Sequence, residues 1–169
     1  SGTRPPGTRL TRAGTLWVFL ANIASMGLAA WRALAPTAFP VWLQFQLPAW
    51  LNLLGAGLFV IYSVWGWLVV VFNPNYTPCY RPAQGRFLLA AHGPYAVVRH
   101  PRYAAEALMN IGFVLFTGSW VSLVGMAAWG ALHRQALAEE VYLQSLAGEV
   151  YTAYRARVGM FFPKKPGRV

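Results

Sequence analysis

Carboxylates and cysteines are scarce in this sequence. Only four of the 169 residues are acidic, all in the C-terminal half, and Cys79 is the single cysteine. One cysteine cannot build a disulfide framework or a thiolate metal cluster. The three histidines, His92, His100 and His133, lack the spacing and the acidic partners of a motif such as H-E-x-x-H. We therefore expect no metal site.

Charge of either sign is also low. Charged residues make up 11% of the chain, against about 25% in ordinary soluble proteins, whereas hydrophobic residues make up 57%. This composition is typical of an integral membrane protein. The net charge of +10 could suggest a nucleic-acid partner, but the basic residues lie between apolar segments and not on one large polar surface. We expect membrane lipid, and no nucleic acid, as the surrounding partner.

Two apolar stretches are present that can cross a membrane. At about 1.5 Å of rise per residue, Leu16–Leu34 and Leu51–Phe72 are each long enough for a hydrocarbon core of about 30 Å. Residues 1–15 are rich in Gly, Pro, Thr and Arg and are expected to form a flexible tail. Residues 35–50 combine prolines with tryptophans and no charge, which favours a short interfacial connector.

Small residues in both stretches predict close helix packing. Ala21, Ser25 and Ala29 recur every four residues in the first stretch. The second stretch contains Gly55, Gly57 and Gly66. Small side chains allow two helix backbones to approach each other within a membrane.

The C-terminal half is predicted to contain a helical hairpin. Residues 73–86 form a turn-rich loop, and the apolar run Phe87–Ala91 is too short to span. A helix is expected over Tyr103–Thr117, and Gly118 and Ser119 interrupt it. A second helix is expected over Trp120–Ala138, so that the two form a tight hairpin.

The last part of the chain is expected to leave the membrane. Apolar and charged residues alternate at helical spacing over Glu139–Met160, and Gly148 is expected to break or bend this amphipathic helix. The tail P-K-K-P-G-R-V is expected to be disordered or anchored on anionic lipid.

The basic residues predict an orientation. Basic residues outside the spans lie in the N-terminal tail, in the loop before Tyr103 and in the C-terminal segment. Residues 35–50 and Gly118–Ser119 carry none. Cytoplasmic loops are enriched in Lys and Arg. We therefore predict a single all-α membrane domain over residues 1–169, with about four transmembrane helices, a cytoplasmic amphipathic C-terminal helix, and both termini in the cytoplasm.

Polar chemistry is concentrated between Gly93 and Glu106. Pro101 disfavours helical geometry at the preceding residue, so Arg99 and His100 are expected on irregular backbone just before a helix. The N–H groups at a helix N-terminus suit a carboxylate or another electron-rich group. The alternative is a turn whose basic residues only anchor the next helix at the lipid surface.

Further acidic and aromatic residues follow the hairpin. Glu139 and Glu140 come after His133 and Arg134, and could be either ligand-binding groups or a solvated helix exit. Glu106 lies one turn from Asn110, and could serve function or simply reach back to Arg102 or water.

The order of these motifs resembles a known family. The chain contains G-P-Y-x-x-V-R-H-P-x-Y, a short apolar hairpin, E-E-x-x-L, and G-E-x-Y-x-x-Y-x-x-R-V. Together these elements resemble the isoprenylcysteine carboxyl methyltransferase family and its short bacterial relatives. The resemblance extends over residues 93–163, within a methyltransferase-like half that we delimit as residues 87–163; residues 16–72 carry no such signal.

The resemblance implies an integral-membrane methyltransferase that uses S-adenosylmethionine and releases S-adenosylhomocysteine. It implies a lipophilic substrate, either a prenylated cysteine carboxylate or a related lipid or thiol. The cofactor-binding residues that it implies are Tyr95, Arg99, His100, Pro101, Tyr103, Glu139, Glu140, Tyr151 and Tyr154. The catalytic residues that it implies are Arg157, Glu149 and His100, with Arg155 nearby.

Three positions depart from the family pattern. Ala105 stands where a glycine is common, Val150 replaces the second acid of G-E-E-Y, and Gly159 replaces the proline of R-V-P. Glu149 is therefore the only acid available in the C-terminal motif.

The expected chemistry needs few groups. Methyl transfer requires an in-line nucleophile and a site that excludes water, and arginine can hold a carboxylate through two hydrogen bonds. We expect Arg99 or Arg157 to orient a carboxylate and a glutamate to hold the ammonium or ribose hydroxyls of the cofactor. An amine or thiol acceptor would also need a base, for which His100 or a glutamate is available.

Two other functions are compatible with the sequence. Membrane sterol reductases, which use NADPH, are similar in this C-terminal half. A noncatalytic membrane scaffold or small transporter could also keep the fold. Binding of S-adenosylhomocysteine, of NADPH or of neither would distinguish the three.

Overall fold

The computed structural model describes residues 12–73 and 88–164. Its helices in chain order are α1 (Arg12–Leu34), the 3-10 turns η1 (Pro36–Ala38) and η2 (Val41–Leu43), α2 (Ala49–Val71), α3 (Pro94–Val97), α4 (Pro101–Thr117) and α5 (Trp120–Arg157). These residues contain no strand, only two isolated bridges. The all-α prediction is confirmed for this part of the chain.

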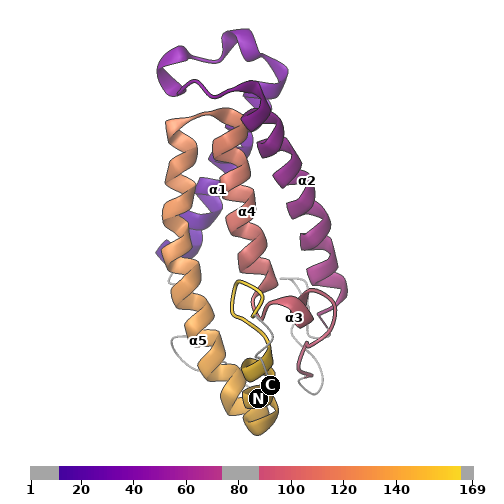
Figure 1. The fold of residues 1–169 in the computed structure, drawn as a ribbon. Coiled ribbons are helices and arrows are strands. Elements are labelled where there is room, and N and C mark those ends of the chain that lie inside the picture. The colour runs from indigo at the N-terminus through magenta and orange to yellow at the C-terminus, as the bar shows by residue number, and fades with distance from the viewer. Residues whose placement is uncertain (1–11, 74–87, 165–169) are drawn as a thin grey trace.

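The long helices form an elongated bundle. In Figure 1 the connector from α1 to α2 and the turn between α4 and α5 lie at one end, and α3 with the end of α5 lies at the other. The outer faces of the bundle carry large exposed apolar side chains, among them Leu53, Val60 and Trp67 on α2. Within the described ranges, α2 is the one helix long and apolar enough to cross a membrane, and Phe19–Leu34 in α1 is a shorter apolar stretch.

Close packing of α2 on α4 depends on one of the three glycines expected to permit it. A Cβ on Gly55 would meet the backbone of α4, including the carbonyl oxygen of Gly112 at 2.7 Å. Asn52 of α2 stabilises the same contact, because its Nδ2 donates a hydrogen bond to the Leu115 carbonyl of α4 at 2.8 Å. The expectation was wrong for Gly57 and Gly66, where no atom lies within 4 Å of an added Cβ.

The small-residue face of α1 is used for packing. Ala21 and Ser25 are buried, and the Ser25 hydroxyl lies 3.5 Å from the position of a Cβ on Gly125 of α5. The same Gly125 faces Asn110 of α4. The first helix therefore packs on the hairpin through small residues, as the sequence predicted.

The predicted hairpin of α4 and α5 is confirmed. Gly118 ends α4 in the left-handed region, with φ 56°, where glycine has no steric penalty. Ser119 then caps α5 by accepting a hydrogen bond from the Val121 N–H at 3.3 Å. The turn is tied to the connector, because the Phe45 N–H donates to the Gly118 carbonyl at 2.7 Å.

Several boundaries differ from the sequence prediction. Helix α4 begins at Pro101 and not at Tyr103, since proline suits the first helical position. Residues 12–15 already belong to α1, and the short α3 was not predicted. The helix that starts at Trp120 does not end at Ala138, because no proline or glycine lies between Ala138 and Gly148.

The predicted break at Gly148 is confirmed, with φ 51° inside α5. After this kink the chain packs back on itself, and Tyr151, Tyr154 and Val158 form a buried cluster. Residues 1–11, 74–87 and 165–169, with the expectations for most of the N-terminal tail, the loop around Cys79, Phe87 and the end of the basic tail, lie outside the described residues.

Candidate functional site

The two polar segments identified in the sequence meet through backbone pairing. Val98 and Gly159 form a parallel bridge. The Arg99 N–H donates to the Gly159 carbonyl at 2.8 Å, and the His100 N–H donates to the Met160 carbonyl at 3.0 Å. The segment that precedes α4 is thus held by the segment that follows α5, which places their side chains at the same end of the bundle.

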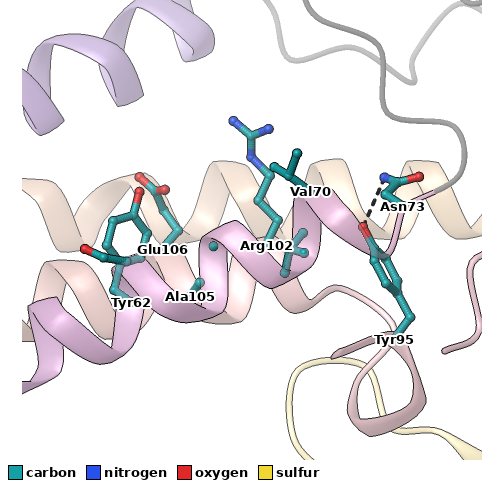
Figure 2. Close-up of a pocket in the computed structure, with 10 residues that line it drawn as sticks. Tyr62, Val70, Asn73, Tyr95, Arg102, Ala105 and Glu106 are labelled. Atoms are coloured by element: carbon teal, nitrogen blue, oxygen red, sulfur yellow. Dashed lines mark hydrogen bonds between the residues drawn. The ribbon is translucent and has the colours of Figure 1, made fainter. Parts of the chain in front are cut away.

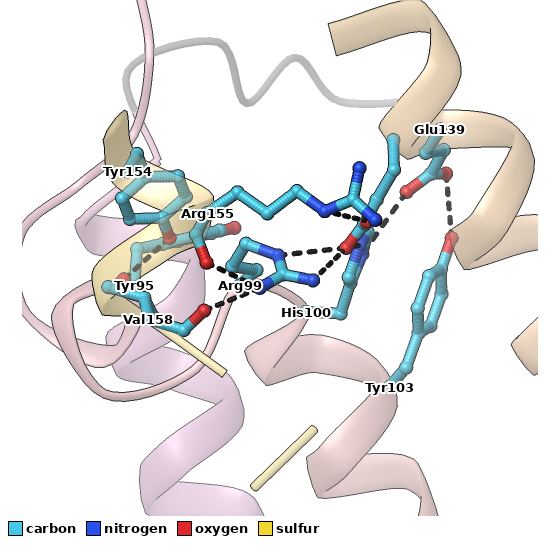
Figure 3. A network of polar contacts seen from close by, with 9 residues as sticks. Tyr95, Arg99, His100, Tyr103, Glu139, Tyr154, Arg155 and Val158 are labelled. Atoms are coloured by element: carbon cyan, nitrogen blue, oxygen red, sulfur yellow. Dashed lines mark hydrogen bonds and ion pairs between the residues drawn. The ribbon is translucent and has the colours of Figure 1, made fainter. Parts of the chain in front are cut away.

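Arg99 and Glu140 form the centre of a polar network (Figure 3). The Arg99 Nη2 lies 2.7 Å and its Nε 2.8 Å from Glu140 Oε1, and the two side chains are only 9% and 6% exposed. The Arg99 Nη1 also donates to the Val158 carbonyl. Buried charges are tolerated only when they are paired and hydrogen-bonded, and this guanidinium has partners on α5 and on the residue that follows it.

His100 lies against both glutamates. Its Nδ1 is 3.7 Å from Glu139 Oε2 and its Nε2 is 3.4 Å from Glu140 Oε1. The buried Nε2 makes no hydrogen bond within the described part of the chain. Burial lowers the pKa of His100 below its usual value, against the opposing effect of the two carboxylates. The imidazole is therefore neutral at pH 7.

Glu139 is held from two helices but remains accessible. The Tyr103 hydroxyl donates to its Oε1 at 2.7 Å, and the Gln135 Nε2 donates to the same oxygen at 3.0 Å. The side chain is nevertheless 33% exposed, unlike that of Glu140. The two consecutive glutamates therefore differ: Glu140 is enclosed by Arg99, and Glu139 can still reach a ligand.

Two buried tyrosines near the end of α5, Tyr151 and Tyr154, lie beside the network. The Tyr154 hydroxyl donates to the Tyr95 carbonyl at 2.6 Å. Tyr151 is fully buried and its hydroxyl has no hydrogen-bond partner of good geometry among the residues described. Burial raises the pKa of Tyr151 to about 12, and burial likewise raises the pKa of Tyr154, so both phenols stay neutral.

An aromatic cluster flanks His100. The His100 ring stacks on Tyr103, with centroids 5.6 Å apart and an interplanar angle of 12°. Phe161 lies 5.9 Å from His100, and its ring also contacts those of Trp129 and His133 on α5 at 5.2 Å and 5.7 Å. Ring faces of this kind attract cations and stack on planar groups.

The structure brings together most of the residues predicted for the site. Those that meet in or beside the network are Tyr95, Arg99, His100, Tyr103, Glu139, Glu140, Tyr151 and Tyr154. Pro101 is buried at the start of α4, where its carbonyl accepts from the Trp65 Nε1 at 3.0 Å. Arg155 reaches the network from the surface, 59% exposed and 3.6 Å from Glu140.

Two predicted catalytic residues lie apart from this network. Arg157 is exposed, and its Nε donates to the Ala153 carbonyl on its own helix at 3.4 Å. Glu149 is exposed beside the kink at Gly148. Their catalytic role stays a prediction.

The sequence patterns do not indicate the contribution of backbone and aromatic groups to the site. The carbonyls of Val158, Gly159 and Met160 hold Arg99 and His100, yet a carbonyl leaves no signature in a sequence. Phe161 and Trp129 were not singled out, although Phe161 directly follows the last motif. Only proximity to the motif could have indicated it.

A cavity lies on the other side of α4, between α2 and α4 (Figure 2). Its volume is about 320 Å³. It is lined by Tyr62, Ser63, Gly66, Val69, Val70, Asn73, Tyr95, Arg102, Ala105 and Glu106. Tyr95 belongs to both features, because its ring lines the cavity and its carbonyl accepts from Tyr154.

Comparison with known proteins identifies relatives of this chain. Residues 50–149 match the model of the phospholipid methyltransferase family, which is more than half of the chain. A protein-S-isoprenylcysteine O-methyltransferase from Schizosaccharomyces pombe is 35% identical over 81 residues, which is 47% of this chain and 34% of that protein. The matched stretch thus spans about a third of the relative's length.

Proposed function

Because the chain belongs to the phospholipid methyltransferase family, we propose that it is an integral-membrane methyltransferase that uses S-adenosylmethionine and acts on a lipophilic acceptor. One observation carries the proposal. Two segments far apart in the sequence, around Arg99 and around Glu140, close a polar network with residues 158–161 at one end of the bundle.

The residues in this network fit the proposed cofactor. Its ammonium and ribose hydroxyls require an acceptor, and Glu139 offers a partly exposed carboxylate. Its cationic sulfur and its planar base suit the rings of Tyr103, His100 and Phe161. When bound, S-adenosylmethionine supplies an electrophilic methyl group.

We assign different duties to the residues of the network. Arg99 and Glu140 neutralise each other, so their role is to lock α5 against the start of α4 and to present the neighbouring Glu139. Glu139 binds the cofactor. Neutral His100 accepts a proton if the acceptor is an amine or thiol, whereas an acceptor carboxylate needs no base.

The proposed membrane topology has four crossings, by α1, α2, α4 and the first part of α5. The apolar outer faces and the spanning length of α2 support it. The connector and the turn at Gly118, which lack basic residues, lie at one end of the bundle. Arg99 and Arg155 lie in the polar network at the other end, and Arg102 is in the first turn of α4. The polar network would then face the cytoplasm.

A binding titration tests the proposed function. The full chain in detergent is titrated calorimetrically with S-adenosylhomocysteine and, separately, with NADPH. We expect saturable binding of S-adenosylhomocysteine and none of NADPH. The reverse result would indicate a reductase, and a folded protein that binds neither would indicate a scaffold. Incubation with radiolabelled S-adenosylmethionine and a membrane extract then identifies the species that gains the label.

A further inference from the structure

The cavity between α2 and α4 results from the way the two helices diverge. They touch at Gly55 and Gly112, where backbone meets backbone, and separate toward the end that carries α3 (Figure 1). Gly66, about three turns beyond Gly55 on α2, has open space around it and lines the cavity. Trp65 bridges the helices through its hydrogen bond to the Pro101 carbonyl, which keeps the space at a defined width.

The cavity carries two opposite charges that do not pair with each other. Arg102 and Glu106 lie one turn apart on α4, a spacing at which such residues commonly form an ion pair. Among the described residues Arg102 nevertheless forms no hydrogen bond or ion pair. Arg99, three residues earlier, is fully engaged with Glu140. Arg102 is thus the arginine of this motif that has its charge available.

A hydrogen bond holds the Glu106 carboxylate in place, but no cation among the described residues neutralises its charge. Its Oε1 accepts a hydrogen bond from the Asn22 Nδ2 of α1, and its Oε2 has no partner within the described part of the chain. Figure 2 shows Tyr62 beside Glu106 at one end of the cavity, Asn73 with Tyr95 at the other, and Arg102 between them. Unpaired charges near a membrane are costly and mark functional sites.

We propose that this cavity is the acceptor site, in which Arg102 binds an anionic group and Glu106 binds an N–H donor of the same amphiphile, whose apolar chain lies against Gly66. This assignment rests on the proposed methyltransferase function. Two kinds of molecule have this head group: an amino acid or peptide carboxylate on a single prenyl chain, and an aminophospholipid. Tyr95 lies in both features, since its ring lines the cavity and its carbonyl accepts from the Tyr154 hydroxyl, so the Tyr95 end of the cavity adjoins the polar network.

The first test changes the head-group contacts. Arg102→Gln and Glu106→Gln are compared with Arg134→Gln, which removes a charge from an exposed position on α5. Each protein is assayed with N-acetyl-S-farnesylcysteine and with dioleoylphosphatidylethanolamine vesicles, and its affinity for S-adenosylhomocysteine is titrated. We expect Arg102→Gln to raise the acceptor KM about 10- to 100-fold while kcat and cofactor affinity change little.

The Glu106→Gln variant distinguishes between the two kinds of acceptor, the prenylated amino acid or peptide and the aminophospholipid. Loss of its charge should raise the KM strongly for an ammonium head group, because charge-assisted hydrogen bonds are about twice as strong as neutral ones. It should raise the KM only weakly for an amide N–H. Equal behaviour of Arg102→Gln and Arg134→Gln would overturn the proposal, as would a parallel loss of cofactor affinity in Arg102→Gln.

The second test fills the cavity and does not depend on turnover. Gly66→Leu places a side chain in the cavity, and Gly57→Leu places the same side chain in open space elsewhere on α2. Labelling by a benzophenone-bearing farnesylcysteine is mapped by mass spectrometry. We expect label on residues 62–70 that is lost in Gly66→Leu and kept in Gly57→Leu. Label elsewhere, or equal labelling of both variants, would place the acceptor outside this cavity even if the cofactor binds.

Discussion

At the residue scale, two adjacent glutamates with the same chemistry occupy opposite environments. Glu140 is 6% exposed and neutralises a buried arginine, whereas Glu139 is 33% exposed and shares its hydrogen bonds with Tyr103 and Gln135. Removing one partner of a buried ion pair leaves the other charge uncompensated. Glu139, whose side chain is partly exposed, therefore contributes less to the stability of the fold.

We therefore predict that the same substitution has different effects at the two positions. Glu140→Gln should reduce the free energy of unfolding by about 3–5 kcal/mol, because Arg99 remains buried without its counter-charge. Glu139→Gln should melt near the wild-type temperature and bind S-adenosylhomocysteine about 10-fold more weakly. Thermal melts and calorimetry of the detergent-solubilised variants measure both. A Glu140→Gln protein as stable as the wild type would show that Glu140 does not compensate the buried charge of Arg99.

At the element scale, the approach of α2 to α4 is set at a single glycine. Gly55 leaves no room for a side chain, since an added Cβ would overlap the backbone around Phe116 and Leu115. Gly57, two residues further along the helix, faces open space. The close contact at one end also produces the divergence at the other, and hence the cavity.

We predict opposite outcomes for alanine at these two glycines. Gly55→Ala should destabilise the protein by about 1–3 kcal/mol, because α2 must move away from α4. Gly57→Ala should be neutral or stabilising by up to about 1 kcal/mol, since alanine favours the helix and meets no neighbour. Thermal unfolding in detergent compares the two. Similar melting temperatures would mean that the helices are not in contact at Gly55.

At the scale of the whole molecule, the two ends of the bundle differ in charge. The connector from α1 to α2 and the α4–α5 turn are joined by the Phe45–Gly118 hydrogen bond at one end, and the polar network lies at the other. A bundle with this arrangement should present its basic end to the cytoplasm.

This orientation can be measured with single cysteines. In a Cys79→Ala background, Thr37→Cys reports on the connector and Thr152→Cys on the segment after the kink, and both positions are exposed. We expect a membrane-impermeant maleimide to label Thr37→Cys from the extracytoplasmic side and Thr152→Cys only after the membrane is opened. Labelling of both from the same side would contradict the four-crossing topology.

Local sequence was sufficient to predict the long helices of this fold, although not the short α3. Long apolar runs predicted α1 and α2, because only a helix satisfies the backbone of such a run within lipid. Gly118 and Gly148 marked the end of α4 and the kink in α5, since both adopt positive φ that other residues avoid. The motif residues around Arg99 and Glu139 likewise identified most of the network.

Tertiary structure decided which of these residues touch. The sequence could not assign Arg99 to Glu140 and leave Arg102 facing a cavity, because that choice depends on the rotation of α4 between α2 and α5. Nor could it show that the turn after Gly148 brings Tyr151 inward and leaves Glu149 and Arg157 exposed. Helix formation is a local property of the chain, whereas the partner of each face depends on contacts between residues far apart in it.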